Sequence, residues 1–100
     1  MQAVKVADQP EQSRYVLEVD GRLTGLLDYR LAGDRLRLTH AEIDPAMERQ
    51  GLGSRLASFA LDDARQRRLT VVPRCPFIKY YLREHPEYLD LVPEHERLGL

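Results

Sequence analysis

The first forty-five residues carry the pattern of short strands joined by tight turns. Tyr15 to Val19 is rich in aromatic and β-branched side chains, and Asp20-Gly21 then supplies the positive φ angles of a two-residue hairpin turn. A second strand is predicted from about Leu23 to Leu31. After the turn Ala32-Gly33-Asp34, a third strand runs from about Arg35 to Ile43. The three strands are expected to form an antiparallel meander.

The third strand has two distinct faces, because successive side chains of a strand point in opposite directions. One face carries Leu36, Leu38, His40 and Glu42, and the other carries Arg37, Thr39, Ala41 and Ile43. The first face therefore changes from apolar to polar along the strand and brings His40 and Glu42 together near its end.

The pattern changes period after Pro45, which has no N–H to give to a strand ladder. From about Gln50 to Arg68 the apolar residues recur at spacings of three and four, as in an amphipathic helix. They are Leu52, Leu56, Phe59, Ala60 and Ala64. Leu69 to Val72 is a short apolar run typical of a buried strand, and Pro73 stops it. Since a strand, a helix and a strand in this order normally pair in parallel, we expect a mixed sheet with a parallel pair near its middle.

A final helix is predicted from about Pro76 to Glu84, because proline suits the first helical position and His85-Pro86 ends the helix. The tail from Pro86 to Leu100 is expected to pack weakly and to fray. These elements predict an α/β (α+β) fold, built on a mainly antiparallel sheet with a β-α-β crossover. With 100 residues, of which 43% are hydrophobic, the chain is expected to form one domain over residues 1–100.

Charged residues are numerous but balanced, at 31% of the chain and a formal net charge of -1. No overall field therefore attracts nucleic acid or an anionic membrane, and any anion must be bound by a local group of residues. No apolar run approaches the roughly 20 residues of a membrane-spanning helix, and no signal peptide is recognisable. The single Cys75 cannot form an internal disulfide, which agrees with a reducing compartment and a cytoplasmic location.

The junction between the third strand and the long helix holds two glycines, in Gln50-Gly51-Leu52-Gly53-Ser54. Unpaired N–H groups meet the positive end of a helix dipole there, and glycine lets a diphosphate approach the backbone closely. Arg49 and Arg55 add positive charge at the edges. Taken alone, the pattern has a second interpretation, which is a tight turn or close packing against a strand.

The order of these elements resembles the GNAT superfamily of acetyl-coenzyme A dependent N-acetyltransferases. The resemblance spans about Tyr15 to Val92. It is closest where Ile43-Asp44-Pro45 stands before Gly51-x-Gly53, similar to the Val-x-Pro and Arg/Gln-x-x-Gly-x-Gly/Ala segments of that family. Pro73-Arg74-Cys75-Pro76-Phe77 and His85-Pro86-Glu87-Tyr88 resemble its compact single-domain branch, which lacks the helices that larger members carry before the meander.

The resemblance implies that acetyl-coenzyme A is the cosubstrate, with no metal. The residues it assigns to the cosubstrate are Ile43, Arg49, Gln50, Gly51, Leu52, Gly53, Ser54 and Arg55. The chain departs from the family at Glu48, three residues before Gly51, where the family prefers Arg or Gln. A carboxylate there opposes a phosphate, so weaker binding of the cosubstrate is expected.

The family fold also implies that the strands Arg35–Ile43 and Leu69–Val72 separate at their ends and leave a cleft for the pantetheine arm and the thioester. Direct transfer needs a base that takes a proton from the amine and an acid that protonates the departing thiolate. His40 and Glu42 are candidates for the base. The alternative is that both belong to an ordinary strand surface.

Two residues of the last helix complete the candidate chemistry. Tyr81 occupies the place of the family's acid tyrosine, and its alternative role is core packing with Phe77 and Ile78. Cys75 directly precedes Pro76 at the helix amino terminus, where the dipole favours a thiolate. It is either a nucleophile that accepts the acetyl group or a small buried residue that lies near that group without being acylated.

We therefore expect an enzyme that transfers acetyl from acetyl-coenzyme A to an amine, of a small molecule or of a peptide or protein lysine. Direct attack in a ternary complex is the expected mechanism, with participation of Cys75 as a variant. One alternative is a coenzyme A binding module without turnover, which Glu48 favours, and another is a plain interaction domain. Nucleic acid and membrane are not expected partners, and the chain is expected to be a monomer or a homodimer.

Overall fold

In residues 2–100, which a computed structural model describes apart from the side chains of Glu48 and Arg49, five strands form one sheet. They lie across the sheet in chain order as β1 (Val4–Gln9), β2 (Arg14–Val19), β3 (Arg22–Ala32), β4 (Arg35–Ile43) and β5 (Thr70–Pro73). Neighbouring strands are antiparallel except for the parallel pair of β4 and β5. The predicted class, with a mainly antiparallel sheet and a β-α-β crossover, is confirmed.

The parallel pair lies at one edge of the sheet, so its predicted place near the middle is wrong. Among the described strands β5 has β4 as its single neighbour, and helices follow it in the chain. The opposite edge is formed by β1, which the sequence pattern did not mark as a separate strand. Its side chains are mostly half-buried, and this weakens the alternation that marks a strand with one buried face.

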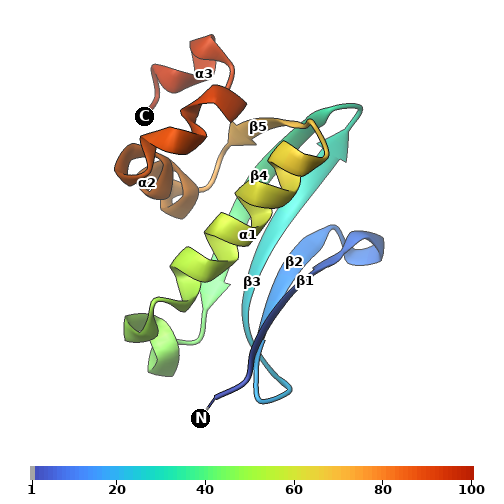
Figure 1. Ribbon diagram of the computed structural model, residues 1–100, viewed down its shortest axis with the longest axis vertical. Coiled ribbons are helices and arrows are strands. Elements are labelled where there is room, and N and C mark those ends of the chain that lie inside the picture. The colour runs from blue at the N-terminus through green and yellow to red at the C-terminus, as the bar shows by residue number, and fades with distance from the viewer. Residues whose placement is uncertain (1) are drawn as a thin grey trace.

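Helix α1 (Leu52–Gln66) lies along one face of the sheet, and α2 (Pro76–Glu84) and α3 (Glu94–Arg97) gather beside β5 (Figure 1). The part of the chain that the structure describes also contains three 3-10 segments, namely η1 (Pro10–Gln12), η2 (Pro45–Gln50) and η3 (Pro86–Leu91). The core lies between α1 and the sheet. Its fully buried side chains include Leu17, Leu27, Leu36, Leu38, Leu56, Leu61 and Val71.

The turns explain where the strands and α1 end. Asp20 and Gly21 both have positive φ angles, 52° and 80°, as the predicted hairpin turn requires. α1 begins after Gly51, at φ 72°, and ends before Arg68, at φ 58°. Both residues are in the left-handed region, which breaks the helical hydrogen-bond pattern, so the helix is shorter at each end than the predicted span Gln50–Arg68.

A β-bulge in β4 overturns the predicted faces of that strand. Across β3, Asp28 pairs with His40 and Tyr29 pairs with Leu38, so Thr39 is an extra residue with no partner. Its hydroxyl donates to the Asp28 carbonyl at 3.2 Å. Because one inserted residue reverses the alternation, the side chains after the bulge exchange faces.

The exchange puts Ala41 and Ile43 on the α1 side and His40 and Glu42 on the opposite side. A Cβ on Gly25, for example, would lie 2.6 Å from Ile43 Cδ1 and 3.7 Å from the buried Leu17. The prediction that His40 and Glu42 continue the face of Leu36 and Leu38 is therefore wrong. We call the side of β3 and β4 that faces away from α1 the open face, because its side chains Arg30, Arg35, Arg37, His40 and Glu42 are exposed.

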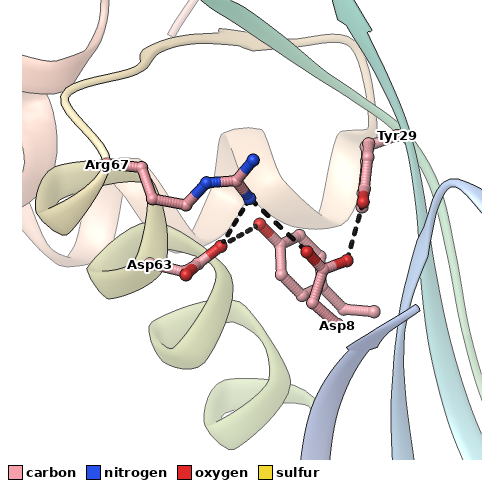
Figure 2. A network of polar contacts seen from close by, with 5 residues as sticks. Asp8, Tyr29, Asp63 and Arg67 are labelled. Carbon is pink, nitrogen blue, oxygen red and sulfur yellow. Dashed lines mark hydrogen bonds and ion pairs between the residues drawn. The ribbon is translucent and has the colours of Figure 1, made fainter. Parts of the chain in front are cut away.

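A polar network fastens β1 to the end of α1 (Figure 2). The Tyr15 hydroxyl donates to Asp63 at 2.8 Å, and the Tyr29 hydroxyl donates to Asp8 at 2.7 Å. Arg67 Nη1 lies between the two carboxylates, 3.1 Å from Asp63 and 3.4 Å from Asp8. Hydrogen bonds and ion pairs of these side chains thus hold the edge strand β1 to the end of α1.

The tail packs against the domain, so the prediction of weak packing is wrong. Val92 is 1% exposed and belongs to the core. The Arg65 guanidinium donates to both oxygens of Asp90, at 2.7 and 2.9 Å, and Arg74 binds Glu96 in the same way at 2.8 Å for both bonds. Among residues 2–100, no helix is both long and apolar enough to cross a membrane.

Candidate active site

β4 and β5 separate beyond Leu38. Their pairing ends where Leu38 faces Pro73, and the Arg74 N–H then donates to the Leu38 carbonyl at 2.9 Å. β4 continues to Ile43, whereas the other chain turns into α2 at Pro76. In the described part of the chain, the edge of β4 after the bulge therefore has no strand beside it. Backbone groups on such an edge are free to pair with a ligand.

A pocket of about 270 Å³ lies where these elements diverge. It is lined by Ala41 and Ile43 of β4, Gly53 of α1 and Phe77 of α2. The lining side chains are apolar, so the pocket suits an uncharged chain rather than an ionic group. The predicted cleft at the separating strand ends therefore has a counterpart in the structure.

Gly51 opens α1 and leaves its first turn uncovered. It is the N-cap residue, and none of the described side chains caps the helix. No acidic residue lies in the first turn, and a Cβ on Gly51 would meet nothing within 4 Å. The first N–H groups of α1 are thus accessible to an anion, and the helix dipole favours one there.

Gly53 has a different reason to be glycine. A Cβ at this position would lie 3.0 Å from Phe77 Cζ and 3.7 Å from Ile43 Cγ1. This is the close packing that the sequence allowed as an alternative. The two glycines therefore differ in place, with Gly51 in the open turn and Gly53 in the pocket wall.

The remaining residues assigned to the cosubstrate divide by exposure. Gln50, Ser54 and Arg55 are exposed around the first turn of α1, whereas Leu52 is 3% exposed and packs in the core. The Gln50 amide approaches Met47 Sδ at 3.5 Å. The side chains of Arg49 and Glu48 lie outside the described part of the structure.

His40 and Glu42 are brought together, but on the open face. His40 Nε2 lies 3.6 Å from Glu42 Oε2, and the two side chains are 57% and 65% exposed. Ala41 and Ile43, which alternate with them, line the pocket on the α1 side. The sheet therefore separates the candidate bases His40 and Glu42 from the residues that line the pocket.

Cys75 lies at the point where β5 passes into α2. It is the N-cap of α2, is 3% exposed, and its carbonyl accepts the Lys79 N–H at 3.0 Å. The preceding residue, Arg74, is the one that binds the Leu38 carbonyl. Cys75 therefore lies next to the point where β4 and β5 separate. Its side chain belongs to the buried core cluster.

Tyr81 lies in the interface between α1 and α2. It is 6% exposed, and its ring stacks on His85 with centroids 4.0 Å apart. Burial raises the pKa of its hydroxyl, and the hydroxyl of Ser58 on α1 acts in the opposite direction. The tyrosine is thus a packed residue whose hydroxyl is protonated at neutral pH. Tyr80, by contrast, is 55% exposed.

Three residues of the site were not assigned to it from the sequence. Phe77 and Ala41 line the pocket, and Thr39 forms the bulge. Phe77 has a detectable signal, because it lies in the first turn of a predicted helix one turn before Tyr81. The bulge at Thr39 has no such signal in the sequence, because no glycine or other turn residue marks it. Within the described residues, no group of three His, Cys, Asp or Glu side chains is placed to hold a metal ion.

Comparisons with solved structures identify the fold. A GCN5-like protein of Staphylococcus aureus, solved by NMR, superimposes with a TM-score of 0.70 at 18% identity, over 89% of this chain and 87% of that chain. The ribosomal-protein-S18-alanine N-acetyltransferase of Escherichia coli gives 0.60 at 15% identity, over 73% of this chain and 66% of that one.

N-acetylglutamate synthase of Neisseria gonorrhoeae, in complex with coenzyme A and N-acetyl-glutamate, gives a TM-score of 0.54 at 20% identity. The match covers 70% of this chain but only 19% of the synthase. No curated protein matches the sequence significantly. The structural matches define the fold as that of acetyltransferases.

The model of the GCN5-related N-acetyltransferase family matches residues 14–91. The chain therefore belongs to this family and is an acyltransferase enzyme. The matched span contains the glycine turn, the pocket, Cys75 and Tyr81.

Proposed function

We propose that this chain binds acetyl-coenzyme A across the first turn of α1 and transfers the acetyl group to an amine of a peptide, a protein or a small molecule. The observation that carries the proposal is the apolar pocket at the separation of β4 and β5, which opens next to the uncovered N–H groups after Gly51. A diphosphate on those N–H groups and an acyl chain in the pocket are the two ends of one ligand. Arg49 and Arg55 add charge at the rim in this proposal.

In our proposal the acceptor lies on the open face, where His40 and Glu42 are exposed, and its amine reaches the thioester past the edge of β4 after the bulge, where the pairing with β5 has ended. An acceptor ammonium gives up a proton to this pair, and the amine nitrogen attacks the thioester carbonyl carbon. The C–S bond breaks as the C–N bond forms, and the departing thiolate takes the hydroxyl proton of Tyr81. Burial of Tyr81 is compatible with this role only in that it raises the pKa of the hydroxyl, so the residue enters the reaction in its protonated form.

A second route passes through Cys75. In this route its thiolate attacks the thioester, the acetyl group moves to Cys75 Sγ with release of coenzyme A thiolate, and the amine then attacks the new thioester. The place of Cys75 at the amino terminus of α2 favours the route, and its 3% exposure opposes it. We propose direct attack as the main path for this reason.

A module that binds coenzyme A without turnover is the second candidate function. The observation that favours it is the acidic Glu48 at a position where the family prefers Arg or Gln. A measurement of turnover distinguishes the proposed enzyme from the binding module. Purified protein is incubated with acetyl-coenzyme A and a panel of amines, and free thiol release is followed together with acceptor mass.

A gain of acetyl mass on an acceptor supports the proposed enzyme, and binding of acetyl-coenzyme A without any acetylated acceptor supports the module. Intact mass of the protein after incubation without an acceptor shows whether Cys75 is acylated. A variant Cys75→Ala that keeps its rate establishes direct attack, and one that loses turnover while binding acetyl-coenzyme A establishes the two-step route.

A further inference from the structure

The open face carries positive charge that the fold does not use. Arg30 and Arg37 lie directly opposite each other on β3 and β4, and Arg35 follows on the same side of β4. All three side chains are exposed. Among the hydrogen bonds and ion pairs of the described residues, none involves the side chain of any of them. Like charges directly opposite each other on neighbouring strands destabilise a sheet.

A carboxylate that lies beside these arginines on the same face, that of Asp28, is already paired. Asp28 precedes Arg30 by two residues on β3, but its carboxylate accepts from Arg14 Nε at 3.1 Å. Arg14, Asp28, Arg30 and Thr39 together line a polar pocket of about 430 Å³. The face next to the bulge therefore has one paired arginine and three arginines without a counter-ion, in a chain whose net charge is -1.

We propose that Arg30 and Arg37 bind an acidic side chain of a peptide whose amine is the acetyl acceptor. The inference rests on the proposed function, since it assigns the substrate class of the same site. An arginine pair on a sheet face offers several N–H donors to a carboxylate, and the carboxylate relieves the repulsion between the two guanidinium groups.

The distance along β4 fixes where the acidic residue lies. Arg37 pairs with Arg30, and His40 pairs with Asp28 two residues away on β3, because Thr39 between Arg37 and His40 is the extra residue of the bulge. The separation along the strand is therefore about 7 Å. An extended peptide that lies along β4 covers this distance with two residues, and side chains two residues apart point to the same face. The preferred acceptor is therefore a lysine with a glutamate or aspartate two residues away.

The openness of the face favours a peptide over a small acidic amine. A small molecule usually needs a concave site that buries most of its surface. His40, Glu42, Arg35 and Arg37 are exposed on a sheet surface, and such a surface gives affinity only to a ligand that spreads over several residues.

The test compares acetylation of three synthetic peptides that are identical except for one residue, two positions from the lysine, which is glutamate, glutamine or lysine. We expect the glutamate peptide to have the lowest KM, with little difference in kcat. In Arg30→Gln or Arg37→Gln, KM for the glutamate peptide should rise about threefold, and in the double variant about tenfold, as expected for exposed ion pairs. The glutamine peptide should be unaffected.

Arg22→Gln is the matched control, because Arg22 is also an exposed arginine of β3 but lies at the other end of that strand. The preference for glutamate should weaken as salt is raised to about 0.5 M, since exposed charges are screened. Equal KM values for the glutamate and glutamine peptides, or an equal loss in Arg22→Gln, overturn the proposal.

A binding measurement separates this proposal from the proposed function. The anisotropy of the fluorescently labelled glutamate peptide is titrated with protein, with or without acetyl-coenzyme A. Weaker binding in the double variant supports the arginine site even where no acetyl transfer occurs, and in that case the proposed function alone fails. Binding that is unchanged by the double substitution, or tighter binding of a single-stranded RNA oligonucleotide than of the glutamate peptide, overturns the arginine site as a peptide site.

Discussion

Gly53 and Phe77 are in such close contact that a single added carbon on Gly53 would lie 3.0 Å from Phe77 Cζ. Both residues line the pocket beside β4. The size of the pocket therefore depends on Gly53 of α1, which has no side chain, and on the position of the Phe77 ring of α2.

Gly53→Ala should weaken acetyl-coenzyme A binding about tenfold, which is about 1.4 kcal/mol. The added methyl group pushes the Phe77 ring by a few tenths of an ångström, and the pocket narrows. The melting temperature should change little, because alanine favours the helix by up to about 1 kcal/mol over glycine. Isothermal titration measures the affinity. Adding Phe77→Leu should restore part of it, and an unchanged Kd in Gly53→Ala would show that the ligand does not use this pocket.

Tyr81→Phe should lower kcat by about 10²-fold or more and leave the Kd of acetyl-coenzyme A nearly unchanged, because it removes only the proton donor. Its neighbour Tyr80 provides the control. Tyr80 is 55% exposed, whereas Tyr81 is 6% exposed and stacked on His85. Tyr80→Phe should have the wild-type rate. Equal rates in both variants would leave Tyr81 with a packing role alone.

The tyrosines of the polar network should make the fold sensitive to alkali. Burial, and then the hydrogen bond to Asp63, raises the pKa of Tyr15 well above its usual value near 10, and burial with Asp8 does the same for Tyr29. Above pH 10 the unfolded chain loses these protons while the folded chain keeps them. The free energy of unfolding should therefore fall as the pH rises beyond about 10.

Urea unfolding at pH 8 and pH 11 measures this effect. Tyr15→Phe should destabilise the protein by about 1 kcal/mol at pH 8, because it leaves Asp63 without one hydrogen bond. The same variant should lose less stability than the wild type between the two pH values. If the free energy of unfolding fell equally in the wild type and in Tyr15→Phe between these pH values, Tyr15 would not be the cause of the sensitivity to alkali. Tyr80→Phe, whose ring is exposed, serves as the control.

Val92→Ala should destabilise the domain by about 1–2 kcal/mol, because the Val92 side chain is 1% exposed in the core. Leu98→Ala, at a residue that is 92% exposed, should change stability by less than about 0.5 kcal/mol. Chemical denaturation of the two variants compares them directly. A neutral Val92→Ala would mean that the tail does not contribute to the cooperative core.

Local signals predicted most of the fold. β4 and α2 have the predicted bounds, and the Asp20-Gly21 turn has the predicted backbone angles. These features depend on residues that are neighbours in sequence, namely turn glycines and helix-starting prolines. The packing of the tail was missed because it depends on Arg65 and Arg74, whose partners Asp90 and Glu96 are more than twenty residues away in the chain.

The candidate site was only partly predictable for a related reason. The glycine turn is local, and the structure has it at the predicted junction between β4 and α1. The faces of β4 depend on Thr39, whose pairing with β3 cannot be deduced from strict alternation. One unpaired residue therefore reversed the expected positions of His40 and Glu42, and it moved Ala41 and Ile43 to the pocket.

The bulge has a further consequence for how the protein can change in evolution. A change that paired Thr39 with β3 as an ordinary strand residue would turn Ala41 and Ile43 outward and His40 and Glu42 toward α1 in a single step, which exchanges an apolar lining for a charged one. The nine residues of β4 thus serve two compartments, and the amino acids of one can vary without altering the other as long as the bulge is kept.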